Sequence, residues 1–219
     1  SGYNYYVPEM APEPMTTEEA ARKNYSVFSA RYGNIYTARQ LLQMVRRAYG
    51  EYTPLDNAWL RDDGRYVDPF RPQIDPDGFA SVADVEAARV DHFRAVRDII
   101  EKSDIFVFTL GLTEGWCRRE DGAVFPLAPG VAGGEFDPVT YQYINFRASE
   151  IVADVAQAIT EMRLRNPGLR FIFTVSPVPL IATNEAKRHV LTATTYSKAA
   201  LRVAAEEIAM QFGGVAYFP

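Results

Sequence analysis

The chain has 219 residues, of which 47% are hydrophobic and 23% are charged, and its net charge is −5. These values are typical of a globular protein of one domain, and they exclude a disordered or fibrous chain. The acidic charge excludes the electrostatic attraction that binding to nucleic acid or to an anionic membrane surface requires. No apolar run approaches the roughly 20 residues that span a bilayer. The single cysteine, Cys117, cannot form an internal disulfide, so we expect a protein of the reducing cytoplasm.

The two ends of the sequence suggest that it is a piece of a longer protein. The chain starts at Ser1-Gly2 without a methionine or a signal-like apolar segment. It stops at Pro219, just where a strand pattern begins. We therefore expect an internal fragment with one domain over residues 1–219, whose catalytic residues could lie outside it.

The first third of the chain predicts two helices with a long irregular segment between them. Apolar residues recur at helical spacing over residues 37–48 and again over residues 81–102. Residues 51–80 are rich in aspartate, proline and glycine, which makes periodic structure unfavourable. Aromatic and aliphatic residues are interleaved among them, so we expect a long ordered excursion that packs on the domain. Loops of this length are usually functional.

The rest of the chain alternates strands with helices. Continuous apolar runs at residues 105–110, 171–175 and 215–218 predict strands that are covered on both faces. Helical periodicity marks residues 145–165 and 195–212, and the stretch between 116 and 138 is irregular. This alternation implies right-handed crossovers and a parallel sheet. The predicted fold is an α/β three-layer sandwich.

Two loops follow strands of this sheet at their carboxyl ends, where open parallel sheets bind ligands. The first loop runs from Gly111 to Trp116, and the second begins at Ser176. Both loops place polar side chains and irregular backbone where a site is expected. The alternative is that any strand-to-helix loop contains such residues, and spacing alone leaves the two interpretations equal.

The excursion contains an acid and an arginine beside aromatic residues, in the segment Asp68-Pro69-Phe70-Arg71-Pro72. An arginine next to an aromatic surface could clamp a carboxylate or line a sugar. Equally, Asp68 and Arg71 could form a salt bridge that holds the loop in place. The sequence does not decide between these two roles.

The histidines and the cysteine do not form a recognisable catalytic or metal-binding pattern. His92 falls on the apolar side of its helix, which favours a hydrogen-bonded histidine in the core or at its rim. His189 lies in a polar stretch and is expected in solvent. Neither histidine has metal-ligand spacing, so no metal and no cofactor are expected. Cys117 lacks a nucleophile signature, and a buried inert thiol is favoured.

Several segments resemble successive blocks of the GSCFA family, in the right order and over nearly the whole chain. These blocks are RYGNIYT at 31–37, DIFVFTLGLTEGW at 104–116, TVSPVPL at 174–180, and YSK at 196–198. The family is similar to the SGNH, or GDSL-like, hydrolases. The resemblance implies a flavodoxin-like sheet, which agrees with the predicted alternation of strands and helices.

The resemblance also implies a mechanism and a site. In SGNH enzymes a serine attacks an acyl carbonyl, a glycine N–H and an asparagine side chain form the oxyanion hole, and a late Asp-x-x-His supplies the base. The serine and the Asp/His block are expected upstream of Ser1 and beyond Pro219. Gly33 corresponds to the oxyanion glycine, while Thr113 and Glu114 stand where the family pattern has an asparagine and the next acid. A threonine offers one hydrogen-bond donor where an amide offers two.

Two functions are therefore expected from the sequence. The first is a serine ester hydrolase or O-acyltransferase acting on an acylated small molecule or carbohydrate, with Gly33, Thr113 and Glu114 at its active-site edge. The second is a non-catalytic module on the same fold that binds a glycan or a peptide. The residues expected to contact the substrate are Asn34, Asp68, Arg71, Gly111, Trp116 and Ser176.

Overall fold

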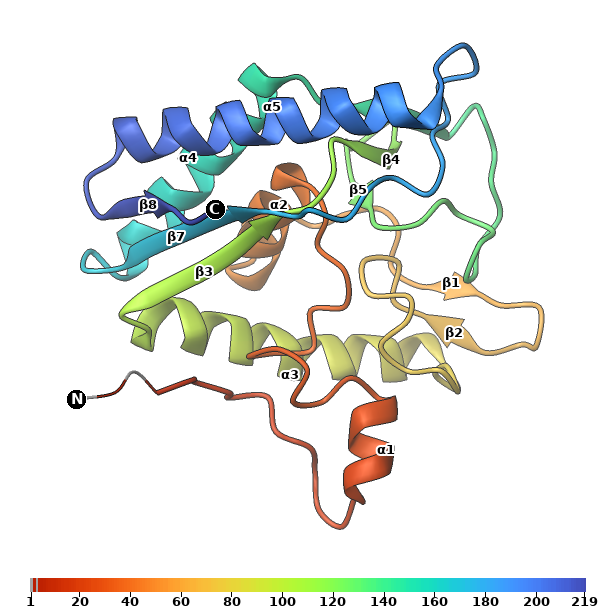
Figure 1. The fold of residues 1–219 in the computed structure, drawn as a ribbon. Helices are drawn as coiled ribbons and strands as arrows, with labels where there is room; N and C mark the ends of the chain where they lie inside the picture. The colour runs from red at the N-terminus through yellow and green to blue at the C-terminus, as the bar shows by residue number, and fades with distance from the viewer. Residues whose placement is uncertain (1, 3) are drawn as a thin grey trace.

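A computed structural model describes residue 2 and residues 4–219 (Figure 1). The helices are α1 (Thr17–Arg22), α2 (Ala38–Ala48), α3 (Val82–Lys102), α4 (Ala148–Arg165) and α5 (Val190–Gln211). The strands are β1 (Trp59–Leu60), β2 (Tyr66–Val67), β3 (Ile105–Leu110), β4 (Glu114–Arg118), β5 (Val124–Phe125), β6 (Tyr141–Asn145), β7 (Arg170–Val175) and β8 (Val215–Tyr217). None of the described helices is both long enough and apolar enough to cross a membrane.

The main sheet is parallel, with the order β3-β7-β8. β7 is the central strand, and its Phe171 pairs with Phe106 of β3 on one side and with Val215 of β8 on the other. The three strands lie within one residue of the bounds predicted from the apolar runs. The mixed α/β class and the parallel pairing are thereby confirmed.

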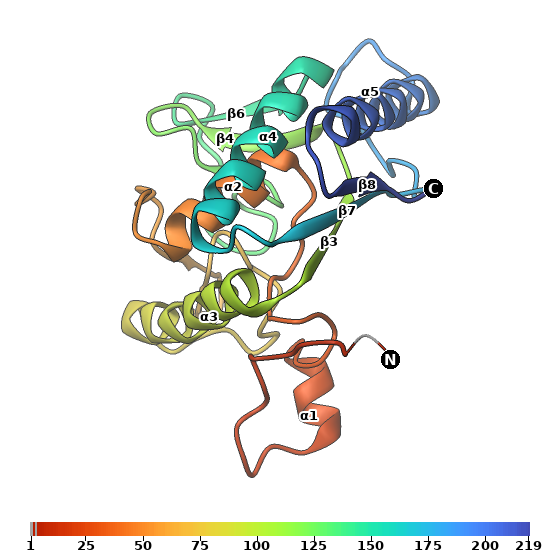
Figure 2. The same ribbon diagram turned by 90° about the vertical axis from the view of Figure 1, so that its left-hand side faces the viewer.

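Only one face of this sheet is covered by the described helices. Phe106, Phe108 and Phe173 point into a core shared with α2, α3, α4 and α5, whereas the side chain of Val107 is 61% exposed. Figure 1 shows α2 and α4 behind the sheet, and Figure 2 shows them to the left of it, with no described helix across the opposite face. The expectation that these strands are covered on both faces is therefore wrong: Val107 and Thr109 alternate outward with period two.

The covered face depends on α2, whose start is well defined by sequence. The side chain of Thr37 accepts a hydrogen bond from the Gln40 N–H, and the Gln40 side chain accepts one from the Thr37 N–H, which forms a capping box. α2 packs along α4, and the ion pairs of Arg39 with Asp154 and of Arg46 with Glu161 flank this contact. The cap thus fixes both the start of α2 and the loop that precedes it.

We expect Thr37→Ala to lower the free energy of unfolding by about 1 kcal/mol, because the N-terminal N–H groups of α2 lose their acceptor. Chemical denaturation would measure the change. Thr195→Ala is the matched control, since that exposed hydroxyl bonds to Leu191 within α5 and caps nothing. A loss no larger than that of the control would contradict the capping role.

A second, smaller sheet and a hairpin lie beside the main sheet. β4 pairs antiparallel with β5 and β6, and β1 pairs with β2 inside the 51–80 excursion. The β4–β6 sheet and the excursion pack against each other in a second, separate hydrophobic cluster, in which Phe125 contacts Trp59 and Phe70. β5 and most of β4 lie in the stretch 116–138 that the sequence predicted as irregular. β6 ends at Asn145, where a helix was predicted to begin, and α4 begins at Ala148.

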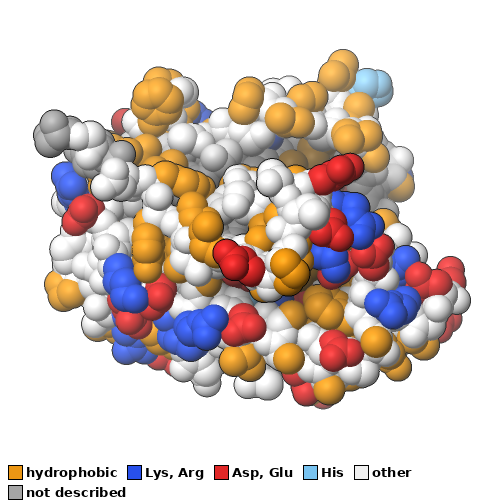
Figure 3. All heavy atoms as spheres, turned by 90° about the horizontal axis from the view of Figure 1, so that it is seen from below, with side chains coloured by type: hydrophobic (Ala, Val, Ile, Leu, Met, Phe, Trp, Pro, Cys, Tyr) orange, Lys and Arg blue, Asp and Glu red, His pale blue; other side chains and the backbone are white. Residues whose placement is uncertain are grey.

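The outer side of the excursion is tied to the N-terminal segment by surface ion pairs. Arg22 of α1 pairs with Asp77 at 2.7 Å, and Lys23 pairs with Asp75 at 2.9 Å. Figure 3 shows positive and negative side chains interspersed on the face seen from below. An exposed pair such as Arg22–Asp77 contributes about 0–1 kcal/mol, whereas the side chain of Asp75 is only 11% exposed.

Candidate functional site

The carboxyl ends of β3 and β7 lie side by side, as parallel pairing requires. The Ser176 N–H donates to the Leu110 carbonyl at 2.9 Å, so the loops after the two strands start from adjacent points. The N–H groups of Gly111 and Leu112 both donate to the carbonyl of Tyr36 at 3.0 Å. The segment that precedes α2 therefore closes onto the first of these loops. A Cβ at position 111 would lie 3.1 Å from the Tyr36 carbonyl oxygen, so this close approach favours glycine over any residue with a side chain.

Helix α5 holds this first loop from the other side. Lys198 donates from Nζ to the Gly111 carbonyl at 2.8 Å, and burial lowers the pKa of this lysine. The Thr113 N–H donates to the Ser197 hydroxyl at 3.2 Å. Thr113 is fully buried, and its own hydroxyl has no hydrogen-bond partner among the described residues. Such a group is an unused donor, and few of these occur in native structures.

Glu114 opens β4 and faces a mixed polar and aromatic surface. It accepts a hydrogen bond from Thr183 at 2.8 Å and lies opposite Asn145 in the β4–β6 register. Two residues further along the same face, Trp116 lies opposite Tyr143, with ring centroids 6.0 Å apart. These side chains are partly exposed, so a carboxylate and two aromatic rings are accessible at the edge of the site.

Gly33 and Asn34 contact the excursion. Gly33 has φ +64°, and a Cβ there would lie 3.4 Å from the Arg71 Cα. The Asn34 amide donates to the Gln73 side chain at 3.3 Å. Tyr36 connects this segment to Gly111, as described above. The pairing of Gly33 with Thr113 across an oxyanion hole stays a prediction.

Asp68 and Arg71 form a buried ion pair, with the Arg71 Nε 3.1 Å from the Asp68 carboxylate. Their side chains are 1% and 4% exposed, and Arg89 of α3 also approaches Asp68, at 3.4 Å. Burial would raise the pKa of Asp68, but Arg71, Arg89 and Arg47 outweigh it and hold that pKa well below its usual range. The pair therefore forms the salt bridge that holds the excursion in place, which is the second of the two roles expected from the sequence. Both side chains are too buried to contact a substrate in this structure.

The family resemblance can be tested directly against the chain. A model of the GSCFA family matches residues 15–219. This chain belongs to the GSCFA family. No curated protein and no solved structure matches it. The site of this GSCFA chain is therefore argued from its own geometry.

The remaining candidates in the GSCFA chain have structural environments. His92 is buried in the core, as its position on the apolar helix face predicted, with Nδ1 2.8 Å from the Glu9 carboxylate. Burial lowers the pKa of His92 to about 4, and Arg71 adds to this, so the ring is neutral near pH 7. His189 is exposed and accepts from the Leu191 N–H at the start of α5. The Cys117 thiol is buried in the core and bonds to the Arg118 carbonyl.

The interaction partners in and near this site could not be found from sequence. Glu9 lies far along the chain from His92, and the same is true of Thr183 relative to Glu114. No local pattern links residues at such separations. The family block Tyr196-Ser197-Lys198 was the one signal that pointed to the α5 side of the site.

Proposed function

We propose that this GSCFA chain carries the oxyanion side of an SGNH-like serine ester hydrolase or O-acyltransferase. The nucleophilic serine and the Asp/His base belong to segments outside the 219 residues. The observation that carries the proposal is the Gly111–Glu114 loop at the carboxyl edge of the parallel sheet, fixed by Tyr36, Ser197 and Lys198. A flavodoxin-like, three-layer arrangement, with a second layer over the open sheet face, is part of the same proposal.

The chemistry assigned to the loop is stabilisation of a developing negative charge. When the serine oxygen bonds to the carbonyl carbon of an ester, the base takes the hydroxyl proton and the carbonyl oxygen becomes an oxyanion. The carbonyl then re-forms, the bond from its carbon to the alcohol oxygen breaks, and the base returns the proton to the leaving alcohol. Preorganised donors lower this barrier because they need no reorganisation during the reaction. We assign the unpartnered Thr113 hydroxyl as one such donor, which reaches an ester only once the loop opens, because Thr113 is fully buried here. We assign the Gly33 N–H as the second donor.

The surface beside Glu114 favours a carbohydrate ester as substrate. A sugar offers hydroxyl donors on an apolar ring, and the Glu114 carboxylate with the Trp116 and Tyr143 rings complements both features. Ser176 begins the loop after β7, and Asn34 lies two residues before Tyr36 in the segment that precedes α2; both are partly exposed. We assign them to the same substrate-binding edge.

The proposal is tested by assaying aryl acetate hydrolysis with two chains. The 219-residue chain should show no turnover, because residual catalysis without the nucleophile is at most roughly 10³–10⁴ over water. A chain extended along its gene at both ends should be active, and Cys117→Ser in it should keep the rate within a few-fold. Full activity of the 219-residue chain, or loss of the rate in Cys117→Ser, would overturn the assignment.

Glu114→Gln in the extended chain should lower kcat/KM for a carbohydrate ester by about tenfold, because a neutral amide replaces the charged acceptor that the proposal assigns to the sugar hydroxyls. The values of kcat and KM are measured with an acetylated sugar. Glu207→Gln, on the exposed side of α5, is the matched control and should leave both values unchanged. Unchanged values for Glu114→Gln would make Glu114 a residue that only ties β4 to Thr183.

A glycan-binding module is the second candidate function, and one observation favours it. Thr113 stands where an SGNH enzyme has an asparagine, which weakens the oxyanion hole, while the aromatic surface of Trp116 and Tyr143 needs no catalysis to bind a sugar. Binding of acetylated oligosaccharides to the extended chain with no release of acetate would favour this module over the enzyme.

A further inference from the structure

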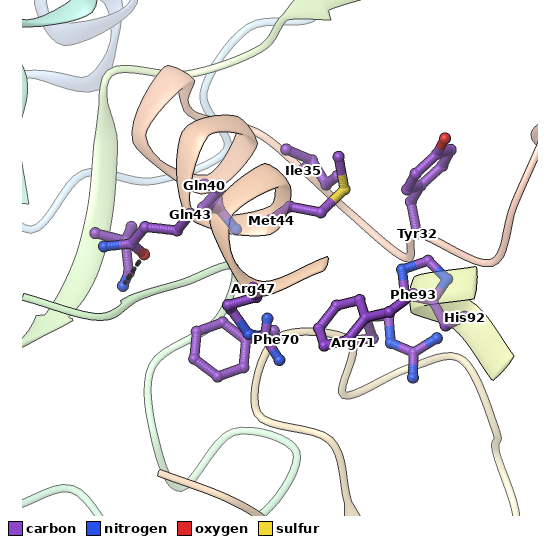
Figure 4. Close-up of a pocket in the computed structure, with 11 residues that line it drawn as sticks. Tyr32, Ile35, Gln40, Gln43, Met44, Arg47, Phe70, Arg71, His92 and Phe93 are labelled. Atoms are coloured by element: carbon purple, nitrogen blue, oxygen red, sulfur yellow. Dashed lines mark hydrogen bonds between the residues drawn. The ribbon is translucent and has the colours of Figure 1, made fainter. Parts of the chain in front are cut away.

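A small cavity lies between α2, α3 and the excursion. Its volume is about 20 Å³, and all its lining residues belong to these elements, the segment before α2 and β5. Figure 4 shows Arg47 from α2, Phe93 from α3 and Arg71 from the excursion around it. A cavity needs roughly 10–15 Å³ of such space for one water molecule, so this one holds a single small ion or about one water.

Two guanidinium groups on the cavity wall have N–H groups without an acceptor among the described residues. Arg71 uses Nε for Asp68 and Nη1 for the Arg31 carbonyl, but its buried Nη2 has no partner among the described residues. Arg47 is 9% exposed and stacks on the rings of Phe70 and Phe93, at 3.6 and 5.1 Å from their centroids. No described residue accepts a hydrogen bond from its guanidinium. Guanidinium N–H groups are strong donors that normally find acceptors when buried.

The charges around the cavity do not balance. Four guanidinium groups and two carboxylates gather here, and all are buried except Arg89, whose side chain is 14% exposed: Arg31, Arg47, Arg71, Arg89, Glu9 and Asp68. Asp75, whose charge also reaches Arg31, is already paired with Lys23. His92 adds no charge near pH 7, and burial lowers the pKa of Arg47 to about 9. Two positive charges are thus left without a counter-charge, and burying unpaired charge is costly.

We propose that this cavity binds one chloride-sized inorganic anion between Arg47 and Arg71. The N–H groups of Arg47 supply the donors, Arg71 on the same wall adds a second positive charge, and the rings of Phe70 and Phe93 line the cavity beside them. A phosphate or an organic carboxylate is too large for the available volume. The bound anion ties α2 to the excursion, so it acts as a structural ion that is independent of the proposed ester chemistry.

The first test measures the melting temperature of the 219-residue chain in mixtures of sodium chloride and sodium gluconate at constant ionic strength. Gluconate is too large to enter. Raising chloride from 10 to 300 mM should raise the melting temperature by roughly 3–6 °C, because a ligand that binds the folded state stabilises it. Arg47→Met keeps the contact with the two rings and should abolish this shift. Arg46→Met, its neighbour on α2 whose partner is Glu161 outside the cavity, should retain it.

The second test needs no variant and therefore does not depend on the folding of Arg47→Met. Crystals of the unmodified chain soaked in sodium bromide should show an anomalous peak between Arg47 and Arg71. Equal melting temperatures in chloride and gluconate would overturn the proposal. So would a bromide peak without any chloride effect in solution, which is binding at crystal concentration only, or a shift that Arg47→Met retains, which is a general salt effect.

Discussion

Asp68→Asn is expected to lower the free energy of unfolding by about 3–5 kcal/mol, because removing one partner of a buried ion pair leaves the other charges uncompensated. The carboxylate faces Arg71 at 3.1 Å and Arg89 at 3.4 Å, and it also accepts the Phe70 N–H. Asparagine keeps the size of the side chain, so the change isolates the charge. Urea denaturation monitored by tryptophan fluorescence measures the loss.

The matched control for this experiment is Asp77→Asn. Asp77 pairs with Arg22 at 2.7 Å, a shorter distance than in the Asp68–Arg71 pair, but the side chains of Arg22 and Asp77 are both about half exposed. Exposed pairs contribute roughly 0–1 kcal/mol. If the two variants lost the same free energy, burial would not be what makes Asp68 important.

The free energy of unfolding is expected to fall by about 2–3 kcal/mol between pH 7 and pH 4.5 because of His92. Its folded-state pKa is lowered to about 4, below the ordinary value of 6.5. In this window the unfolded chain binds a proton that the folded chain does not, so stability decreases as the pH falls. Below about pH 4 the carboxylates of Glu9 and Asp68, whose folded-state pKa values are also lowered, add a second loss.

Denaturant titrations at pH 7, 6, 5 and 4.5 measure this dependence. His92→Gln keeps a hydrogen bond to Glu9 but has no proton to gain, so its stability should change little over the window. His189→Gln, at the exposed start of α5, should retain the slope of the unmodified chain. A slope that survives His92→Gln would assign the pH dependence to other groups.

The strands of the main sheet were predictable because they are continuous apolar runs. Which face of the sheet is covered was not predictable. Val107 and Phe106 carry the same apolar signal, yet one points outward and the other into the core. α5 begins at Val190 instead of residue 195 because the His189 side chain, an uncommon cap, accepts the Leu191 N–H. The β4–β6 sheet was missed because β4 contains Gly115 and pairs with a strand that follows a long irregular connection.

The position of the candidate site was predictable from topology, and its inner structure was not. The rule that parallel strands present ligands at their carboxyl ends correctly places the loops after Leu110 and Val175 next to each other. The contacts that fix Thr113 and Glu114 come from Ser197 and Thr183, which are distant in sequence. The sequence fits a ligand-binding and a salt-bridging role of Asp68 equally well. Burial decides between these roles, and it depends on partners such as Arg89, which lies on another element.

The crossover from β3 to β7 has a consequence for how readily this fold can change. Residues 111–169 connect the two strands, and they contain the whole β4–β6 sheet as well as α4. Residues 148–169 alone, with α4, are already as long as an ordinary crossover. Each doubling of a connection costs only about 0.6 kcal/mol of closure entropy. An insertion that begins at Glu114, directly beside the candidate site, therefore adds little to the entropic cost of pairing β3 with β7. A binding surface of a different shape can replace the β4–β6 sheet there while the β3–β7 pairing is kept.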